Sequence, residues 1–460
     1  MCGLIGISSH KQAARLAYHG LFALQHRGQE AAGIVTAKDG QMCQHLGRGL
    51  VTEAISEEAI GKLVGPMAIA HVRYSTAGTK DLVNAQPMLF RNYHGKIAIA
   101  HNGNLTNALT LKRKLEEQGA IFQSTSDTEV VIHLIARKHG KLLDCIVEAL
   151  GQLEGSYSFL LMTPDWIMAA RDPYGFRPLV LGKLGRSFLL ASETAALELL
   201  EAKFLREIAP GEVVIFKGTE QQQIKQLSRR TTEHKQLKIQ QAFCVFEHVY
   251  FARPDSDVFG RNVYEARKAM GRELAKQLQP LKADYVIPIP DSGVSAALGF
   301  SEASGIPMEL GLIRNHYAGR TFIQPLQSLR ELGVRLKLSP LQNTLKGKKI
   351  ILIDDSIVRG TTARKIIRML RKAKVKEIHM AISSPPIISP CFYGIDTPRE
   401  EELLAANMNL KEIKKFLGVD SIQYLSVEGL LRSVHGDKAS YCTACFTKKY
   451  PTPLTDRSQR

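Results

Sequence analysis

Apolar residues in the first 217 positions fall in short runs separated by turn signals. The runs LIGI, MAIAHVRY, KIAIAHNG, YSFLLM and SFLLAS begin at positions 4, 67, 96, 157 and 187. Short apolar runs bounded by turn residues are typical of β-strands. Helical periodicity interrupts them at Lys11–Leu24, Asp127–Arg137 and Leu143–Leu153. The pattern predicts a sheet-rich first domain with helices between its strands.

The second half of the chain has a different pattern. Residues 218–241 are polar, rich in Gln and Lys, and lack an apolar period that would build a core, so we place the linker there. Beyond it, apolar runs such as YVIPIP and KIILID alternate with amphipathic stretches such as Thr361–Lys374, which is typical of a parallel, doubly wound sheet. The sequence predicts domains over 2–230 and 242–460, and a loose tail after Pro451.

Length, charge and cysteine content narrow the class of protein. A chain of 460 residues exceeds what one hydrophobic core supports, which agrees with two domains. The 61 Lys plus Arg exceed the 44 Asp plus Glu, and the formal net charge of +17 favours anionic partners. Because the basic residues are scattered, we expect a phosphorylated small substrate and no nucleic acid. Seven dispersed cysteines and no membrane-length apolar stretch predict a cytoplasmic enzyme with reduced thiols.

Cys2 follows the initiator methionine, so removal of Met1 would leave a thiol and a free amine on one residue. A terminal amine has a pKa of about 7.7–8.0 and accepts a proton near neutral pH, which activates an adjacent nucleophile. Met-Cys starts also occur by chance. The pair alone therefore does not establish a site.

MCGLIGI is followed in order by LQHRGQEAAGI, HVRYSTAG, HNGNLTN and STSDTEV. Together these segments resemble the class II glutamine amidotransferases, which implies an α+β N-terminal nucleophile (Ntn) hydrolase sandwich of two facing sheets between helices. The resemblance implies that Cys2 attacks the glutamine carboxamide and that Asn102 and Gly103 form the oxyanion hole. Arg73 and Asp127 match the residues that bind the α-carboxylate and α-ammonium of glutamine.

A phosphate site is predicted in the second domain. KIILIDDSIVRGTT, at Lys349–Thr362, is an apolar strand that ends in paired carboxylates and continues through Gly and hydroxyls into a helix. Backbone N–H groups at a helix start suit a 5′-phosphate, and Gly360 allows its close approach. Asp354 and Asp355, at the carboxyl end of the strand, can hold ribose hydroxyls and Mg²⁺.

This run resembles the phosphoribosyl pyrophosphate signature of the α/β type I phosphoribosyltransferases. VIPIPDSGVSAALG resembles their pyrophosphate and metal segment, with Ser292 as a third Mg²⁺ contact beside Asp354 and Asp355. LIRNHYAGRTFIQP resembles their mobile loop, but His316 stands where a basic residue is frequent, which puts the charge of the closed loop in doubt. The implied phosphoribosyl pyrophosphate contacts are Asp291, Ser292, Gly293, Arg314, Tyr317, Arg320, Thr321, Asp354, Asp355, Ser356, Arg359, Gly360, Thr361 and Thr362.

With both halves in this order, and GVRLKLSP at Gly333–Pro340, nearly the whole chain resembles the glutamine phosphoribosylpyrophosphate amidotransferases (amidophosphoribosyltransferases). The resemblance implies that ammonia from glutamine displaces pyrophosphate from C1 of phosphoribosyl pyrophosphate and gives 5-phosphoribosylamine, the first step of purine synthesis. It also implies feedback inhibition by purine nucleotides and a homo-oligomer, a tetramer or a dimer. Two alternatives are another acceptor for the ammonia and a non-catalytic phosphoribosyl pyrophosphate sensor.

Four cysteines suggest a metal site. Cys244, Cys391, Cys442 and Cys445 include one C-x-x-C pair, and four thiolates bind either zinc or a [4Fe–4S] cluster. Ligand identity alone does not separate the two. The surrounding segments resemble the iron–sulfur subgroup of the family, which favours the cluster. We expect structural roles for Cys43 and Cys145.

Overall fold

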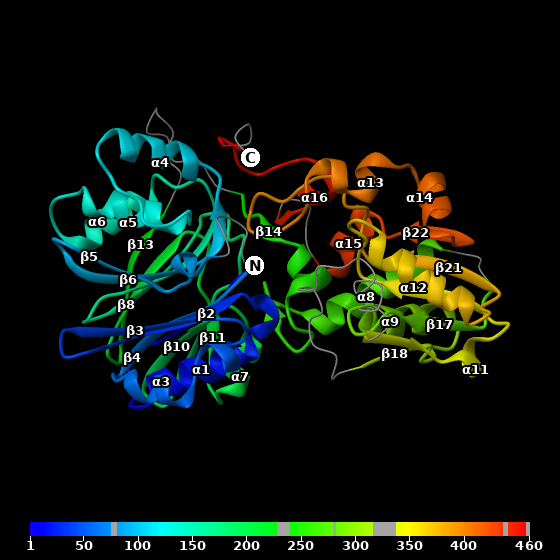
Figure 1. Ribbon diagram of the computed structural model, residues 1–460, viewed down its shortest axis with the longest axis horizontal. Coiled ribbons are helices and arrows are strands. Elements are labelled where there is room, and N and C mark those ends of the chain that lie inside the picture. The colour runs from blue at the N-terminus through cyan, green and yellow to red at the C-terminus, as the bar shows by residue number, and fades with distance from the viewer. Residues whose placement is uncertain (75–80, 228–239, 279–281, 316–336, 436–439, 457–460) are drawn as a thin grey trace.

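The computed structural model consists of two bodies joined side by side, one from the first half of the chain and one from the second (Figure 1). It describes residues 1–74, 81–227, 240–278, 282–315, 337–435 and 440–456. Among these residues, no helix has the length and apolar character that crossing a membrane requires.

Two antiparallel sheets form the first body. The strands of the seven-stranded sheet are, in spatial order, β11 (Lys203–Glu207), β9 (Val180–Leu184), β10 (Ser187–Ala191), β1 (Gly3–Ile7), β4 (Met67–Arg73), β2 (Ala31–Lys38) and β3 (Gln41–Arg48). Those of the six-stranded sheet are β13 (Glu220–Gln226), β12 (Glu212–Lys217), β8 (Ile167–Arg171), β7 (Gly155–Met162), β6 (Gly95–Leu105) and β5 (Met88–Asn92).

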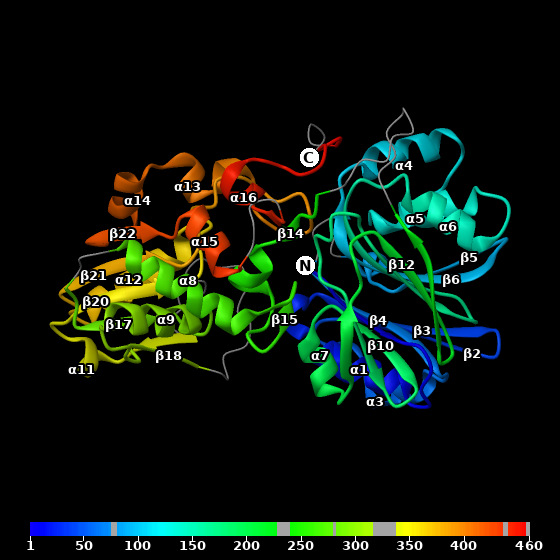
Figure 2. The same cartoon turned by 180° about the vertical axis from the view of Figure 1, so that it is seen from behind.

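The sheets face each other between two layers of helices (Figures 1 and 2). Side chains such as Leu4 and Leu160 fill the space between the sheets, whereas Ile5 and Phe159 face the outer helices. Because both faces are covered, the central strands read as continuous apolar runs rather than as alternation. The outer helices are α1 (Ala13–Ala23), α3 (Glu57–Lys62) and α7 (Thr194–Leu199) on one side, and α4 (Ala108–Glu117), α5 (Thr128–Ala136) and α6 (Leu142–Leu150) on the other.

The predicted linker is wrong in its first part. Residues 220–226 form the edge strand β13, which pairs antiparallel with β12. Gly218, with a φ of +58°, makes the turn between the two strands. An edge strand is held by main-chain hydrogen bonds and tolerates polar residues on its exposed side. The sequence of β13 therefore lacks the apolar pattern from which a strand is predicted.

The second body contains a parallel four-stranded sheet in the order β17 (Tyr285–Pro288), β20 (Lys349–Asp354), β21 (Glu377–Ile382) and β22 (Ser421–Tyr424). Ile351 and Ile353 point toward one helical layer and Ile350 and Leu352 toward the other. These layers are α8 (Val263–Gln277) with α9 (Val294–Ser304), and α12 (Thr361–Lys372) with α14 (Leu410–Leu417). The doubly wound arrangement lies where the sequence predicts it.

The tail after Pro451 is packed and not loose as far as residue 456. Asp456 is 3% exposed and accepts hydrogen bonds from the backbone N–H groups of Leu109 (2.7 Å) and Thr110 (3.2 Å). These donors belong to the first turn of α4, whose own N-terminal residue supplies no side-chain cap, and a carboxylate there also interacts favourably with the helix dipole. The tail thus connects the second body to the first. The polar, Pro-rich sequence of the tail gives no sign of this contact.

Candidate functional site

Cys2 lies at the start of β1, where it reaches across to the facing sheet. Its backbone N–H donates to Oδ1 of Asn102 at 3.2 Å, and its Sγ lies 3.6 Å from the carbonyl oxygen of Tyr74. Asn102 is fully buried, and its Nδ2 has no hydrogen-bond partner among the described residues. A buried amide donor without a partner is costly. Beside the thiol of Cys2, this free donor could accept a developing negative charge.

Gly103 follows on the same strand and is tightly enclosed. A Cβ on Gly103 would lie 2.1 Å from the carbonyl oxygen of Ser156 on the neighbouring strand β7. The position therefore admits only glycine. This enclosure fixes the peptide whose N–H is predicted to complete the oxyanion hole.

Arg73 and Asp127 both reach the same region. Arg73 ends β4 and is 4% exposed. Asp127 precedes α5, and its Oδ2 accepts a hydrogen bond of 2.9 Å from the backbone N–H of Leu105, two residues beyond Gly103. The structure thus brings these residues, far apart in sequence, to one end of the sandwich. Residues 75–80 lie outside the described part of the chain.

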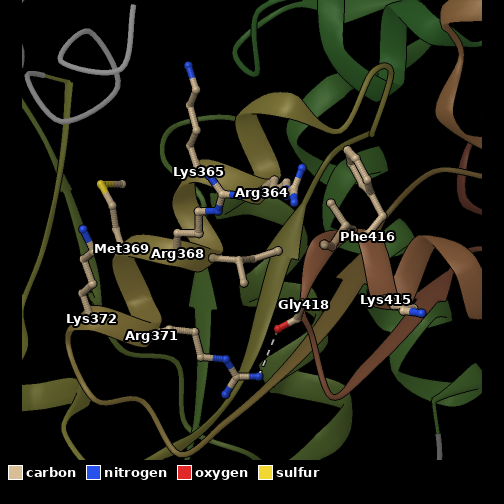
Figure 3. Close-up of a pocket in the computed structure, with 11 residues that line it drawn as sticks. Arg364, Lys365, Arg368, Met369, Arg371, Lys372, Lys415, Phe416 and Gly418 are labelled. Carbon is tan, nitrogen blue, oxygen red and sulfur yellow. Dashed lines mark hydrogen bonds between the residues drawn. The ribbon is translucent and has the colours of Figure 1, made fainter. Parts of the chain in front are cut away.

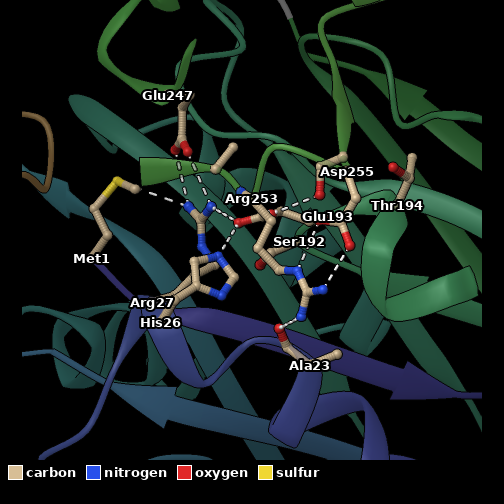
Figure 4. A network of polar contacts seen from close by, with 12 residues as sticks. Met1, Ala23, His26, Arg27, Ser192, Glu193, Thr194, Glu247, Arg253 and Asp255 are labelled. Carbon is tan, nitrogen blue, oxygen red and sulfur yellow. Dashed lines mark hydrogen bonds and ion pairs between the residues drawn. The ribbon is translucent and has the colours of Figure 1, made fainter. Parts of the chain in front are cut away.

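A buried network of charges joins the first body to the second beside Cys2, and its charged members are drawn in Figure 4. Arg27 donates from Nε to the carbonyl oxygen of Cys2 at 2.9 Å. Its Nη atoms contact Glu193 at 2.5 Å and the two carboxylate oxygens of Glu247 at 2.9 and 3.0 Å. Met1 is also buried here, with its Sδ 3.8 Å from Arg27 Nη2.

Burial favours the uncharged form of each group in this network, whereas the oppositely charged neighbours favour the charged form. Burial alone would lower the pKa of Arg27, but Glu247 and Glu193 raise it above its usual value. Burial would raise the pKa of Glu193, but His26 and Arg27 hold it below its usual value. Both residues therefore stay charged. Burial lowers the pKa of the Met1 ammonium to about 5, so the Met1 amine is uncharged at neutral pH.

The sequence does not reveal this network. Arg27 lies in LQHRGQEAAGI, Glu193 in SET and Glu247 in the segment that carries Cys244. All three segments belong to recognisable motifs, but nothing in them indicates a partner for their charged residues. The separations of 166 and 220 residues explain why: only the fold brings the charges together.

The paired carboxylates lie at the carboxyl end of β20. Ser356 Oγ donates to Asp355 Oδ2 at 2.6 Å, and the backbone N–H of Asp355 donates to Asp354 Oδ1 at 3.0 Å. Burial, and then the nearby charge of Asp355, raises the pKa of Asp354. Neither carboxylate forms an ion pair among the described residues, and Asp355 interacts at longer range with the buried guanidinium of Arg267. Gly360, with a φ of +72°, begins α12, so the predicted phosphate loop has the left-handed turn that glycine allows.

The predicted pyrophosphate segment lies beside this loop. The backbone N–H of Ile289 donates to the carbonyl oxygen of Ile353 at 2.8 Å, and a Cβ on Gly293 would lie 2.6 Å from that same oxygen. Asp291 forms an ion pair with Arg314. The carboxyl ends of β17 and β20 therefore carry the two predicted segments together.

One predicted contact pairs with another residue of the chain, and three lie outside the described residues. Arg359 forms an ion pair of 2.9 Å with Glu402, and its side chain is 51% exposed. Tyr317, Arg320 and Thr321, with His316, lie outside the described residues. The structure gives no position for this part of the predicted mobile loop.

The four selected cysteines line one cavity between the two bodies, with the aromatic rings of Phe176, Tyr393 and Tyr450. Cys244 and Cys442 stand directly opposite each other in the parallel pair β14 (Phe243–Cys244) and β23 (Tyr441–Cys442). The backbone N–H of Tyr393 donates to Cys391 Sγ at 3.3 Å. Cys145 is buried in α6, whereas Cys43 is exposed on β3.

A separate basic groove of about 420 Å³ lies between α12 and α14 (Figure 3). Its cationic residues include Arg364, Arg368, Lys372 and Lys415, and the guanidinium of Arg364 lies 4.8 Å from the ring centre of Phe416. None of the residues that line the groove is a predicted phosphoribosyl contact. The positive charge of the chain is therefore not confined to the predicted substrate site.

Comparison with known proteins gives the same two parts. The model of the glutamine amidotransferase domain matches residues 71–199, and that of the phosphoribosyl transferase domain matches residues 261–385. The amidophosphoribosyltransferase of Bacillus subtilis (strain 168) is 48% identical over 459 residues, which cover 98% of this chain and 94% of the relative. That of Methanocaldococcus jannaschii is 48% identical over 466 residues, with coverage of 99% and 98%.

A solved structure agrees over the whole chain. The glutamine phosphoribosylpyrophosphate amidotransferase of B. subtilis complexed with ADP and GMP superposes with a TM-score of 0.91 at 47% identity and covers 98% of both chains. The predicted fold class, an Ntn sandwich fused to a type I phosphoribosyltransferase domain, is thereby confirmed.

Proposed function

The chain belongs to the amidophosphoribosyltransferases, and on that premise we propose which of its residues carry out the family reaction. The enzyme uses glutamine and phosphoribosyl pyrophosphate and catalyses the first step of purine biosynthesis, in which glutamate, pyrophosphate and 5-phosphoribosylamine form. We assign glutamine hydrolysis to residues 2–230 and the transfer of ammonia to residues 242–460.

Cys2 is the nucleophile of glutamine hydrolysis. Once Met1 is removed, the amine of Cys2 accepts the thiol proton, and the thiolate forms a bond to the carboxamide carbon. The ammonium then returns a proton to the leaving nitrogen as the C–N bond breaks, so ammonia departs and a thioester remains. Water hydrolyses the thioester to glutamate and restores the thiol.

The unpartnered Nδ2 of Asn102 is the observation that carries this assignment. Its Oδ1 holds the nitrogen of Cys2, so the amide plane directs Nδ2 to the same side, where the tetrahedral oxyanion forms. With the N–H of Gly103, it supplies two fixed donors in a buried setting, where such bonds are strong. Arg73 and Asp127 bind the two charged groups of glutamine.

The transfer step takes place at the carboxyl ends of β17 and β20. Ammonia forms a bond to C1 of the ribose while the bond from C1 to the pyrophosphate oxygen breaks. The N–H groups at the start of α12 and the hydroxyls of Thr361 and Thr362 bind the 5′-phosphate. Asp354 and Asp355 hold the ribose hydroxyls and orient C1 toward the incoming ammonia.

Mg²⁺ fits this site. Asp354 and Asp355 present adjacent carboxylates that form no ion pair among the described residues, and Mg²⁺ is commonly bound by one or two carboxylates together with substrate phosphates. Ser292 would be its third protein contact. When bound, the ion neutralises the charge of the departing pyrophosphate.

We propose that the four cysteines hold a [4Fe–4S] cluster and that the chain belongs to the iron–sulfur subgroup of the family. A zinc ion would need all four thiolates about 2.3 Å from one centre, whereas in a cluster each cysteine binds its own iron. The cavity lined by all four cysteines and by aromatic rings favours the cluster. It would fasten Cys442 and Cys445 of the C-terminal segment to Cys244.

Regulation and assembly follow from the family. The B. subtilis relative was solved with ADP and GMP, and we assign purine nucleotides to this chain as feedback inhibitors. We also assign it a homo-oligomeric state, a tetramer or a dimer, and a cytoplasmic location. The assignment of nucleotide inhibitors rests on the B. subtilis relative.

Substitution of Asn102 tests the glutaminase assignment. Asn102→Ala removes one oxyanion donor, and we expect glutamate release to fall about 10²–10³-fold while product formation from added ammonia remains. Asn107→Ala is the control, because Asn107 follows on the same segment but bonds to Gln152 and Glu154. If Asn102→Ala releases glutamate at the wild-type rate, the assignment is wrong.

A further inference from the structure

Gly394, in the segment that follows Cys391, lies directly on the peptide of Gly103. A Cβ on Gly394 would lie 3.0 Å from both the carbonyl carbon and the carbonyl oxygen of Gly103 and 3.2 Å from its Cα. Gly394 also has a φ of +100°, which other residues rarely adopt. The second body therefore touches the strand of the predicted oxyanion hole, backbone against backbone.

Hydrogen bonds on both sides of Gly103 fix this contact. The side chain of Asn104 donates to the carbonyl oxygen of Phe392 at 2.8 Å. Ser156, on the adjacent strand, donates to the carbonyl oxygen of Tyr393 at 2.7 Å. The segment 391–394 is thus held across two neighbouring strands of the first body, and Gly103 is enclosed between Ser156 and Gly394.

Further contacts through Tyr393 anchor the segment as well. The ring of Tyr393 stacks on Phe176, with centroids 4.2 Å apart and an interplanar angle of 17°. Its hydroxyl pairs with Thr452 Oγ1 at 3.0 Å, and Arg177 Nε donates to its carbonyl oxygen at 2.9 Å. A segment fixed by several contacts in a close-packed interior does not move aside, so a displacement at one residue is passed on to the residues that it touches.

We infer that residues 391–394 of the transferase body position the oxyanion hole of the glutaminase site, with Gly394 as the positioning residue. This inference rests on the proposed roles of Cys2, Asn102 and Gly103. An oxyanion donor works only when it is fixed close to its ideal position, and small displacements lower the rate strongly. The cysteine-bearing loop therefore sets the rate of glutamine hydrolysis without touching glutamine.

Gly394→Ala tests the inference. The added methyl pushes against the Gly103 peptide, and we expect kcat for glutamine-dependent synthesis to fall about 10²-fold. The KM for glutamine should stay within about twofold, because an interaction made only in the transition state is lost. Synthesis from added ammonia should keep the wild-type rate, which global damage to the fold would not allow.

Gly418→Ala is the matched control. Gly418 has a φ of +78° in the same body, but a Cβ added there would have no atom within 4 Å. The substitution introduces comparable backbone strain without the contact, and we expect both activities to remain. As a second variant, Asn104→Ala removes the bond to Phe392 and should lower glutamine-dependent kcat by a smaller factor.

Three results would overturn the inference. These are an unchanged glutamine-dependent kcat in Gly394→Ala, an equal loss of glutamine- and ammonia-dependent synthesis, and an equal defect in Gly418→Ala. Cys2→Ala separates this inference from the proposed function. If Cys2→Ala still uses glutamine, the proposed nucleophile is wrong, whereas an inactive Cys2→Ala beside a normal Gly394→Ala contradicts only the positioning role.

Discussion

Arg27 and Glu247 form a fully buried, bidentate ion pair that joins the two bodies of the molecule. The partners are 220 residues apart in sequence, and both side chains are 0% exposed. Arg27 also holds the carbonyl oxygen of Cys2. The pair thus links the backbone of the predicted nucleophile to the segment that begins with Cys244.

Glu247→Gln should destabilise the protein strongly. It keeps the shape of the side chain but leaves Arg27 and Arg177 buried near an uncharged amide, and loss of one partner from a buried pair costs about 3–5 kcal/mol. Urea unfolding measures the change in free energy. Glu302→Gln is the control, because the side chain of Glu302 is 47% exposed in its ion pairs with Lys268 and Arg272, and pairs at the surface should contribute little. Equal stability of Glu247→Gln and the wild type would refute a structural role for the pair.

Asp355→Asn should impair the transfer step whatever the source of nitrogen. We expect synthesis from glutamine and from added ammonia to fall by the same factor, about 10²-fold or more, because the site loses a carboxylate for ribose and Mg²⁺. Steady-state rates with each nitrogen source provide the measurement. Asp284→Asn is the matched control and should leave the rate unchanged. Asp284 lies at the opposite end of the same sheet and accepts a hydrogen bond from the backbone N–H of Lys349. A defect restricted to glutamine would contradict the assignment of Asp355.

The cysteine cavity predicts the metal content of the purified protein. Anaerobically prepared protein should be brown and contain iron and acid-labile sulfide, and removal of the iron should lower its thermal midpoint. Cys442→Ser should lose the iron, whereas Cys145→Ser, a buried helical cysteine outside the cavity, should keep it. Colourless, fully active protein containing zinc would refute the cluster.

Acid should weaken the loop that precedes α5. Burial opposes the charge of Glu129, but hydrogen bonds from His133 and Ser124 lower its pKa from 4.5 to about 2. Because the folded pKa is the lower one, the stabilisation is present above about pH 4.5 and is lost as the pH falls toward 2. Urea unfolding across this range should show a smaller loss of stability in Glu129→Gln than in the wild type. Parallel curves for the two proteins would contradict this origin.

Local pattern predicts most of the fold. Residues such as Ile351 and Leu160 lie in apolar runs whose length and spacing reveal buried strands, and a strand of the structure lies at each of these runs. The edge strand β13 escapes this pattern because its backbone pairing leaves no apolar signature. Asp456 escapes it because it caps α4 from a position 347 residues away from Leu109.

The candidate site likewise contains residues that the sequence predicts and residues that only the fold reveals. Asn102 and Asp354 lie in continuous motifs, so the types and order of the residues around them are enough to suggest their chemistry. Glu247 and Gly394 act through partners that only the packing of the two bodies supplies. A glycine with positive φ resembles an ordinary turn in sequence, and its contact with Gly103 becomes visible only in three dimensions.

The nitrogen source used by Cys2→Ala tests the central claim most directly. Formation of 5-phosphoribosylamine from phosphoribosyl pyrophosphate is measured with glutamine and with added ammonia, using protein whose N-terminus is defined by mass spectrometry. Cys2→Ala should form no product from glutamine and should keep the wild-type rate with ammonia. Product formation from glutamine at the wild-type rate, in the variant or in protein that retains Met1, would contradict the account.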